Sequence, residues 1–179
     1  MRQLSNQPPS TLSGFRGHPD TLRAMVRAVH GQRGEQSMLV KSVAEHIVQK
    51  VQPKDYLGEI LAVRYWVTEH VRYLNDPLHV EVVKDPQRIV EEIDARGQAA
   101  EDCDGIALLI GCLCLLIGRV CEFVVVGFGE PGSYSHVFVR VKEPRSGKWI
   151  VCDPVAGSDE RGMLDRVTTF YTKSLDEAA

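Results

Sequence analysis

The sequence has no apolar segment long enough to cross a membrane. Its longest mainly apolar run covers residues 106–117 and is interrupted by Gly111, whereas a membrane-spanning helix needs roughly 20 such residues. Residues 1–13 are polar, include Pro8-Pro9 and lack the apolar core of a secretory signal peptide. We therefore expect no membrane association and no signal peptide, and we interpret the apolar run as a buried helix.

Concentrated positive charge is missing as well. The formal net charge is -3, with 21 Lys and Arg against 24 Asp and Glu, and the basic residues are scattered along the chain. Nucleic acids and anionic membranes are bound mainly through basic patches, so we expect neither as a partner. The length of 179 residues suits one domain with its own core, and the apolar fraction of 44% is ordinary for a globular protein.

The cysteines do not form the even set that a disulfide framework needs. There are five of them: Cys103, Cys112, Cys114, Cys121 and Cys152. With no signal peptide expected, this favours free thiols in a reducing compartment, and thus a cytoplasmic location. Cys112 and Cys114 have the spacing of some metal-binding pairs, but side chains two apart on a helix point about 200° away from each other. We expect both to be buried and unreactive, and we expect no metal site.

Helical periodicity dominates the chain up to residue 117. Residues 1–17 contain few apolar side chains and are interpreted as a flexible leader. Two amphipathic helices follow, one opened by Pro19 and one stopped by Pro53, and they define an N-terminal helical arm over residues 18–55. The core is expected over residues 56–179, with helices predicted over 56–73, 85–97 and 103–117, the last after a short polar loop.

Strand patterns begin only after the apolar helix. Residues 120–128, 136–141 and 149–152 are rich in β-branched and aromatic side chains, and a turn signal at residues 144–147 separates the last two segments. Helices first and strands second predict an α+β fold, in which the helical N-terminal part packs on a small antiparallel β-sheet.

Three polar residues stand at the ends of these apolar segments. Cys103 opens the apolar helix, His136 opens the second strand and Asp153 follows the third. A helix N-terminus and a nearby imidazolium both lower the pKa of a thiol, so Cys103 is expected to be activated and to alkylate before the other cysteines at mildly acidic pH. The free N–H groups of the helix could also bind an oxyanion. His136 would carry the proton and Asp153 would orient the imidazole, as in a catalytic triad.

The hairpin formed by the second and third strands would place His136 beside Asp153, because the far ends of antiparallel neighbours meet. Each residue taken singly also has a structural interpretation. A cysteine at an apolar helix start is often a packing residue, and Asp153-Pro154 is a common turn pair. Asp102 is expected to serve simply as the N-cap of the helix.

The segments Ala99–Leu109, His136–Val139 and Trp149–Pro154 together resemble the transglutaminase-like superfamily. The family's thiol, imidazole and carboxylate match Cys103, His136 and Asp153 in chain order. The resemblance covers residues 62–154 and implies a papain/transglutaminase-like core with its nucleophile at a helix N-terminus. The short subgroup with Asp-Cys-Asp around the thiol and a helical arm before it is similar to proteins of bacterial and phage genomes.

The resemblance also draws attention to four further positions. The family usually has Gly where this chain has Glu101 and often Asp where it has Gly105, and an extra carboxylate near the thiol would oppose thiolate formation. Gln98 lies just upstream of the thiol, as an oxyanion donor does in papain-like enzymes. Trp66 lies at a distance similar to that of the transition-state tryptophan of transglutaminases. Both are oxyanion candidates, with loop and packing roles as the alternatives.

We therefore expect a cysteine-dependent acyl-transfer enzyme that acts on amide bonds of a peptide or protein through a thioester intermediate. Water as the acceptor would make it a peptidase or amidase, and an amine would make it a transferase. No cofactor is expected, and the oligomeric state stays open. The alternative is a weakly active or inactive binding or assembly module, associated with a phage particle, which Glu101 and the polar leader favour.

Overall fold

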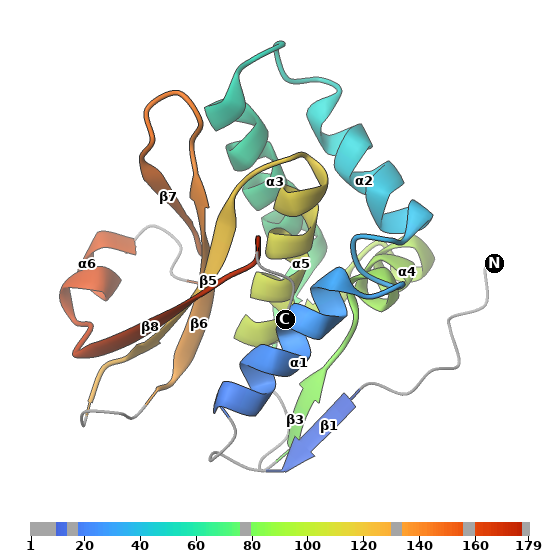
Figure 1. Ribbon diagram of the computed structural model, residues 1–179. Helices are drawn as coiled ribbons and strands as arrows, with labels where there is room; N and C mark the ends of the chain where they lie inside the picture. The colour runs from blue at the N-terminus through green and yellow to red at the C-terminus, as the bar shows by residue number, and fades with distance from the viewer. Residues whose placement is uncertain (1–9, 14–17, 76–79, 130–133, 156–159, 177–179) are drawn as a thin grey trace.

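The computed structural model describes residues 10–13, 18–75, 80–129, 134–155 and 160–176. In these residues the chain forms an α+β fold, as the order of patterns predicts, and helix α5 (Cys103–Leu116) runs through its centre. The other large helices cover one side of α5, and a four-stranded antiparallel sheet covers the opposite side (Figure 1). The functional interest of the fold lies where the start of α5 meets the end of that sheet.

Four helices precede α5 along the chain. They are α1 (His18–His30), α2 (Met38–Val48), α3 (Tyr56–His70) and α4 (Pro86–Arg96). Polar side chains cap the starts of the last three, namely Ser37, Asp55 and Asp85, each of which accepts a backbone N–H of the first turn. Gly97 ends α4 with a φ of 77°, the left-handed conformation in which glycine has no steric penalty. Apolar residues of α1 and α2 belong to the same core as α5, so the predicted arm shares its hydrophobic core with the rest of the chain.

Helix α5 is the buried helix that its apolar sequence predicts. Every residue from Gly105 to Cys114 is buried, because helices pack on one side of α5 and the sheet packs on the other. Gly111 is needed where α5 packs against Leu175. A Cβ there would lie 2.8 Å from Leu175 Cδ1.

The sheet has the strand order β7-β6-β5-β8 and is antiparallel throughout. Its strands are β5 (Cys121–Gly127), β6 (His136–Lys142), β7 (Trp149–Cys152) and β8 (Thr169–Ser174), with α6 (Glu160–Asp165) before β8. The first three are predicted from the sequence and β8 is not. Because β8 lies at the edge and buries little of its surface, its sequence carries a weak apolar signal.

Four short strands form two further pairs. Strand β1 (Ser10–Ser13) pairs antiparallel with β3 (Val80–Val83), and β2 (Val71–Tyr73) pairs parallel with β4 (Ala99–Glu101). Two predictions are corrected here: the third helix ends at His70 rather than at residue 73, and the expected loop before Cys103 is β4. Residues 10–13 of the expected leader also form a strand. Segments of three or four residues are too short to show a period of two and are defined by their partners.

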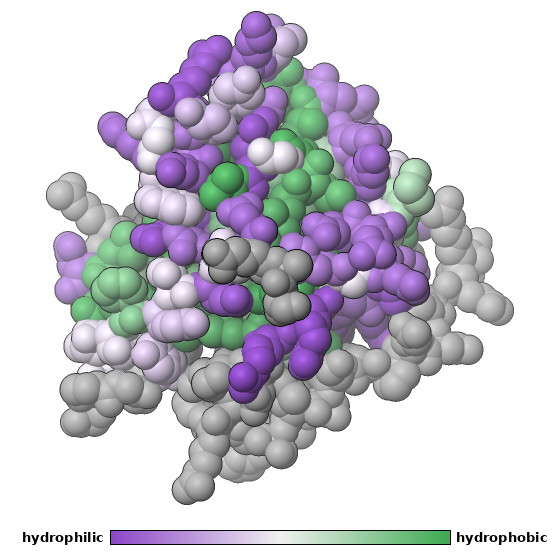
Figure 2. Space-filling model, in the orientation of Figure 1, coloured by the Kyte–Doolittle hydropathy of each residue, from purple (hydrophilic) through white to green (hydrophobic). Residues whose placement is uncertain are grey.

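The surface of the molecule is mostly hydrophilic on the face shown in Figure 2. Apolar atoms are exposed on this face at the left of the view, over α6 and β8. On β8, Phe170 is 67% exposed and Tyr171 is 51% exposed. Among the described residues, no helix combines the length and apolar character that a membrane span requires.

Candidate active site

Cys103 is the first residue of α5, and Asp102 holds the helix start in place. The backbone of Asp102 is extended (φ -83°, ψ -167°), and its carboxylate accepts the N–H groups of Asp104 and Gly105, each at 3.1 Å. The expected N-cap role of Asp102 is therefore confirmed. The thiol of Cys103 is half-buried, whereas the other four cysteines are buried, as expected for Cys112 and Cys114.

His136 and Asp153 form a direct contact at the end of the sheet. The Nε2 atom of His136 lies 2.6 Å from Oδ2 of Asp153, and the two side chains are only 11% and 2% exposed. The strand register explains this contact, because Val139 pairs with Cys152, and extending the register by one residue places Asp153 opposite Phe138. His136 lies two residues before Phe138 and so on the same face of the sheet.

The other carboxylate oxygen of Asp153 also has a partner. Oδ1 accepts the N–H of Val155 at 3.0 Å, which fixes the carboxylate after the strand has ended. Because Asp153 contacts Nε2 of His136, the ring nitrogen that remains for a thiol is Nδ1.

Packing of α5 against β6 brings Cys103 to the same end of the sheet. The backbone N–H of Val137, the residue after His136, hydrogen-bonds the sulfur of Cys103 and acts to lower its pKa. Residues that are 33 positions apart in the sequence (103 and 136) are thus brought together by one helix–sheet contact. The thiol, the imidazole and the carboxylate gather where α5 begins, β6 begins and β7 ends.

The expectation that the thiol has a lowered pKa is wrong for this structure. Burial raises the pKa of Cys103, and the negative charges of Asp104 and Asp102 raise it further, while the bond from Val137 only partly opposes them. The thiol also donates to Oδ1 of Asp104 at 3.6 Å, which favours the protonated form. A thiolate preformed at mildly acidic pH is not favoured by these surroundings. The proton would instead leave during attack, with His136 as general base.

The free N–H groups of the helix start are also fewer than expected. Asp102 takes those of Asp104 and Gly105 with its side chain and that of Ile106 with its carbonyl. The backbone N–H of Cys103 is the one that Asp102 does not use. An oxyanion at this site would therefore need a second donor from outside α5.

The two oxyanion candidates lie in different places. Gln98 is exposed and directly precedes β4. Extended chain rises about 3.3 Å per residue, so Gln98 lies roughly 13 Å from Asp102. Trp66 lies on α3, packs against the main core and stacks on His70, with ring centroids 4.5 Å apart. Trp66 thus packs against the core, and the oxyanion roles of Trp66 and Gln98 stay predictions.

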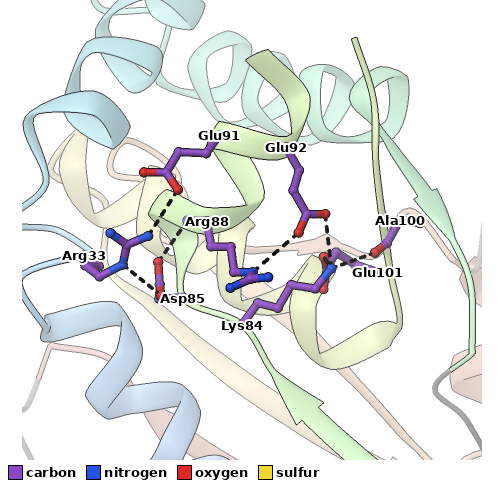
Figure 3. A network of polar contacts seen from close by, with 8 residues as sticks. All are labelled: Arg33, Lys84, Asp85, Arg88, Glu91, Glu92, Ala100 and Glu101. Carbon is purple, nitrogen blue, oxygen red and sulfur yellow. Dashed lines mark hydrogen bonds and ion pairs between the residues drawn. The ribbon is translucent and has the colours of Figure 1, made fainter. Parts of the chain in front are cut away.

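Glu101 is buried behind the start of α5 in a network of ion pairs (Figure 3). Lys84 donates to Glu101 at 2.6 Å, to Glu92 at 3.2 Å and to the carbonyl of Ala100 at 3.4 Å. Burial raises the pKa of Glu101 to about 7, against the opposing effect of Lys84 and with added repulsion from Glu92 and Asp102. Asp104 and Asp102 are the carboxylates whose charges raise the pKa of the thiol. The extra carboxylate of Glu101 forms an ion pair with Lys84 instead.

Tyr73 is a residue of this region that the sequence patterns do not single out. It ends β2, it pairs with Glu101 across the parallel strands, and Leu74 donates its N–H to the carbonyl of Glu101 at 2.9 Å. Burial raises the pKa of the Tyr73 phenol, and so do the negative charges of Cys103 when it is ionised and of Asp102, Asp104 and Asp153. The β2–β4 pairing thus places Tyr73 near the thiol and these carboxylates.

Among the described residues, no group of three or more His, Cys, Asp or Glu side chains is arranged to hold a metal ion. The half-buried thiol, the oriented imidazole and the donors around them form a site suited to nucleophilic attack and proton transfer.

Comparison with known proteins shows a shared fold. No protein-family model matches the chain, and no curated protein matches it. It is similar to a proposed protease from Parabacteroides distasonis, with 14% identity and a TM-score of 0.54 over 87% of this chain and 29% of that one. It is also similar to a proposed cysteine protease from Cytophaga hutchinsonii, with 15% identity and a TM-score of 0.52 over 93% of this chain and 63% of that one.

The chain therefore shares an α+β fold with these two proteins. It spans less than two thirds of the length of either.

Proposed function

We propose that this chain is a cysteine-dependent acyl-transfer enzyme of the transglutaminase-like kind, with Cys103 as nucleophile, His136 as base and Asp153 as the orienting carboxylate. The observation that carries the proposal is the 2.6 Å contact between His136 and Asp153, formed beside the one cysteine of five that is not buried. Similarity to two proposed proteases supports a peptidase-like activity in general terms.

The chemistry requires no group beyond the chain and its substrate. The thiol proton passes to Nδ1 of His136 as sulfur attacks the acyl carbon, and the carbonyl electron pair moves onto oxygen. When that pair returns, the bond to the leaving group breaks and the imidazolium returns its proton to the departing amine. Water or a second amine then attacks the thioester, with His136 again as base. Asp153 keeps the imidazole in the tautomer that can accept at Nδ1.

The proposal also covers the substrate class, and it includes both water and an amine as the acceptor. Amide bonds of peptides or proteins are favoured because the matching motif belongs to a family that acts on them. The pKa-raising surroundings of Cys103 favour a second candidate function, a weakly active or inactive transglutaminase-like binding or assembly module. The cytoplasm is the proposed location because the five cysteines are free thiols, and a phage particle is the alternative that the resemblance implies.

The test uses acylation of the thiol by p-nitrophenyl acetate, which needs no particular side-chain specificity. We expect a burst of p-nitrophenolate and an acetyl group on Cys103 by mass spectrometry. Cys103→Ala should abolish the burst and leave the urea unfolding midpoint close to that of the parent. Cys112→Ala, which keeps Cys103, should retain the burst.

An unfolded protein substrate, incubated with and without a primary amine, then separates hydrolysis from transfer by the mass of the products. A burst that persists in Cys103→Ala would reject this site. If the parent shows no reaction with either the ester or the protein, the binding module is favoured instead.

A further inference from the structure

An oxyanion at Cys103 needs a donor that the sequence does not identify. Asp102 occupies the N–H groups of Asp104 and Gly105, which leaves the N–H of Cys103 for an oxyanion. A single backbone donor is a weak oxyanion site, since such sites usually combine two. Gln98 lies at the opposite end of β4 from the thiol, and the ring of Trp66 packs against the main core and stacks on His70.

Tyr73 lies close to the start of α5, the region where that donor is needed. Strand β2 contacts α5 directly, and its last residue pairs with Glu101, two positions before Cys103. Four groups of the candidate site are close enough to act electrostatically on the phenol. They are Cys103, Asp102, Asp104 and Asp153.

Tyr73 also has the exposure and the chemistry of a substrate-facing donor. The residue is 42% exposed, so a substrate can reach it, and its O–H donates to Oδ1 of Asn75 at 2.7 Å. A neutral phenol surrounded by negative charge stays protonated, because burial and these charges raise its pKa. It can therefore donate to a developing oxyanion without losing its proton.

We propose that the Tyr73 hydroxyl, together with the backbone N–H of Cys103, binds the oxyanion that forms on the substrate during acyl transfer. This inference rests on the proposed function. In the resting protein Asn75 holds the hydroxyl. On attack, the hydroxyl turns from the amide oxygen of Asn75 to the negatively charged oxygen, which is the stronger acceptor.

The experiment compares two reactions of the same thiol in Tyr73→Phe. Acylation by p-nitrophenyl acetate forms the S–C bond through an oxyanion and breaks the ester C–O bond, with the thiol proton going to His136. Alkylation by iodoacetamide displaces iodide at a saturated carbon and forms no oxyanion. We expect acylation to slow about 100-fold and alkylation to stay unchanged.

Tyr65→Phe is the matched control, because Tyr65 is an exposed tyrosine of α3 that bonds Glu69. It should leave both reactions unchanged. Asn75→Ala is a second variant that frees the Tyr73 hydroxyl and should not slow acylation. If Asn75→Ala slows acylation as much as Tyr73→Phe, the Tyr73–Asn75 contact is structural and the inference is rejected.

The outcomes separate the two proposals. Equal acylation of the parent and Cys103→Ala would reject the proposed function and this inference with it. Cys103-dependent acylation that Tyr73→Phe does not slow would reject the role of Tyr73 and leave the proposed function standing. A parallel loss of acylation and alkylation in Tyr73→Phe would place Tyr73 in thiol activation or in the fold, and would also overturn the inference.

Discussion

The carboxylate of Glu101 occupies the space that a side chain at Gly105 would need. A Cβ at position 105 would lie 2.3 Å from Oε2 of Glu101 and 3.0 Å from its Cβ and carboxyl carbon. The two departures from the transglutaminase-like pattern at these positions therefore have one explanation. A carboxylate before the helix excludes a side chain one turn into it, and Lys84 neutralises that carboxylate.

Gly105→Ala should accordingly depend on the residue at position 101. In the parent we expect a loss of roughly 1–3 kcal/mol in the free energy of unfolding, because the new methyl group overlaps a side chain held by Lys84. In a Glu101→Gly background the overlap is removed, and alanine should recover its helix preference of about 1 kcal/mol over glycine. Urea unfolding of the four proteins of this cycle measures the coupling. Additive effects would show that Glu101 moves aside freely.

Glu101 should also make stability depend on pH. Its pKa is about 7 in the folded protein, because of burial, against 4.5 for the exposed group. Between these values the unfolded chain loses the proton first, so stability is full below about pH 4.5 and falls as the pH rises to about 7. Glu101→Gln should remove this fall.

The measurement is the difference in unfolding free energy between Glu101→Gln and the parent at a series of pH values. We expect it to change in favour of the variant by roughly 3 kcal/mol from pH 4.5 to 7.5. Glu143→Gln is the contrasting control. The carboxylate of Glu143 accepts hydrogen bonds from Ser146 and Arg145, and these bonds lower its pKa. A constant difference for Glu101→Gln across this range would contradict the prediction.

Asp153→Asn should stop acyl transfer without unfolding the protein. The amide oxygen can still accept the N–H of Val155, but the amide nitrogen would donate to Nε2 of His136 and place the ring proton on Nδ1. Nδ1 then cannot take the thiol proton, so acylation of Cys103 should fall on the order of 1,000-fold or more. Asp165→Asn, at an exposed position of α6, is the control. A large drop in the urea midpoint with a proportionate drop in activity would point to a structural role for Asp153.

Asp104→Asn should make Cys103 more reactive. Burial is the largest cause of its raised pKa, and the charge of Asp104 comes next. Removing that charge lowers the pKa of the thiol, and alkylation by iodoacetamide at pH 7 should become about tenfold faster. In the parent, the alkylation rate should rise with pH and show no plateau at mildly acidic pH, while Cys112 and Cys114 react only after unfolding. Peptide mapping by mass spectrometry assigns the sites, and an unchanged rate in the variant would contradict this account.

Much of the fold and of the candidate site follows from local sequence patterns. The apolar run after Cys103 predicts α5 because a helix that is apolar on all sides has to be buried on all sides. Asp85-Pro86 and Gly97 mark both ends of α4 through capping, which is a local interaction. The turn at residues 144–147 predicts the β6–β7 hairpin, and with it the closeness of His136 and Asp153.

Other features depend on partners that are distant in the sequence. Strands β2 and β4 have three residues each, and their pairing is what places Tyr73 next to the thiol. The pKa of Cys103 is set by burial and by neighbouring carboxylates, and these outweigh the helix N-terminus that the sequence reveals. The sequence by itself determined the helices α1 to α5, the strands β5 to β7 and the three candidate catalytic residues, because propensity, capping and periodicity act over a few residues. Only the tertiary structure decided the protonation preference of the thiol and the placement of Tyr73 and Lys84, because desolvation and charge interactions depend on distances that packing alone sets.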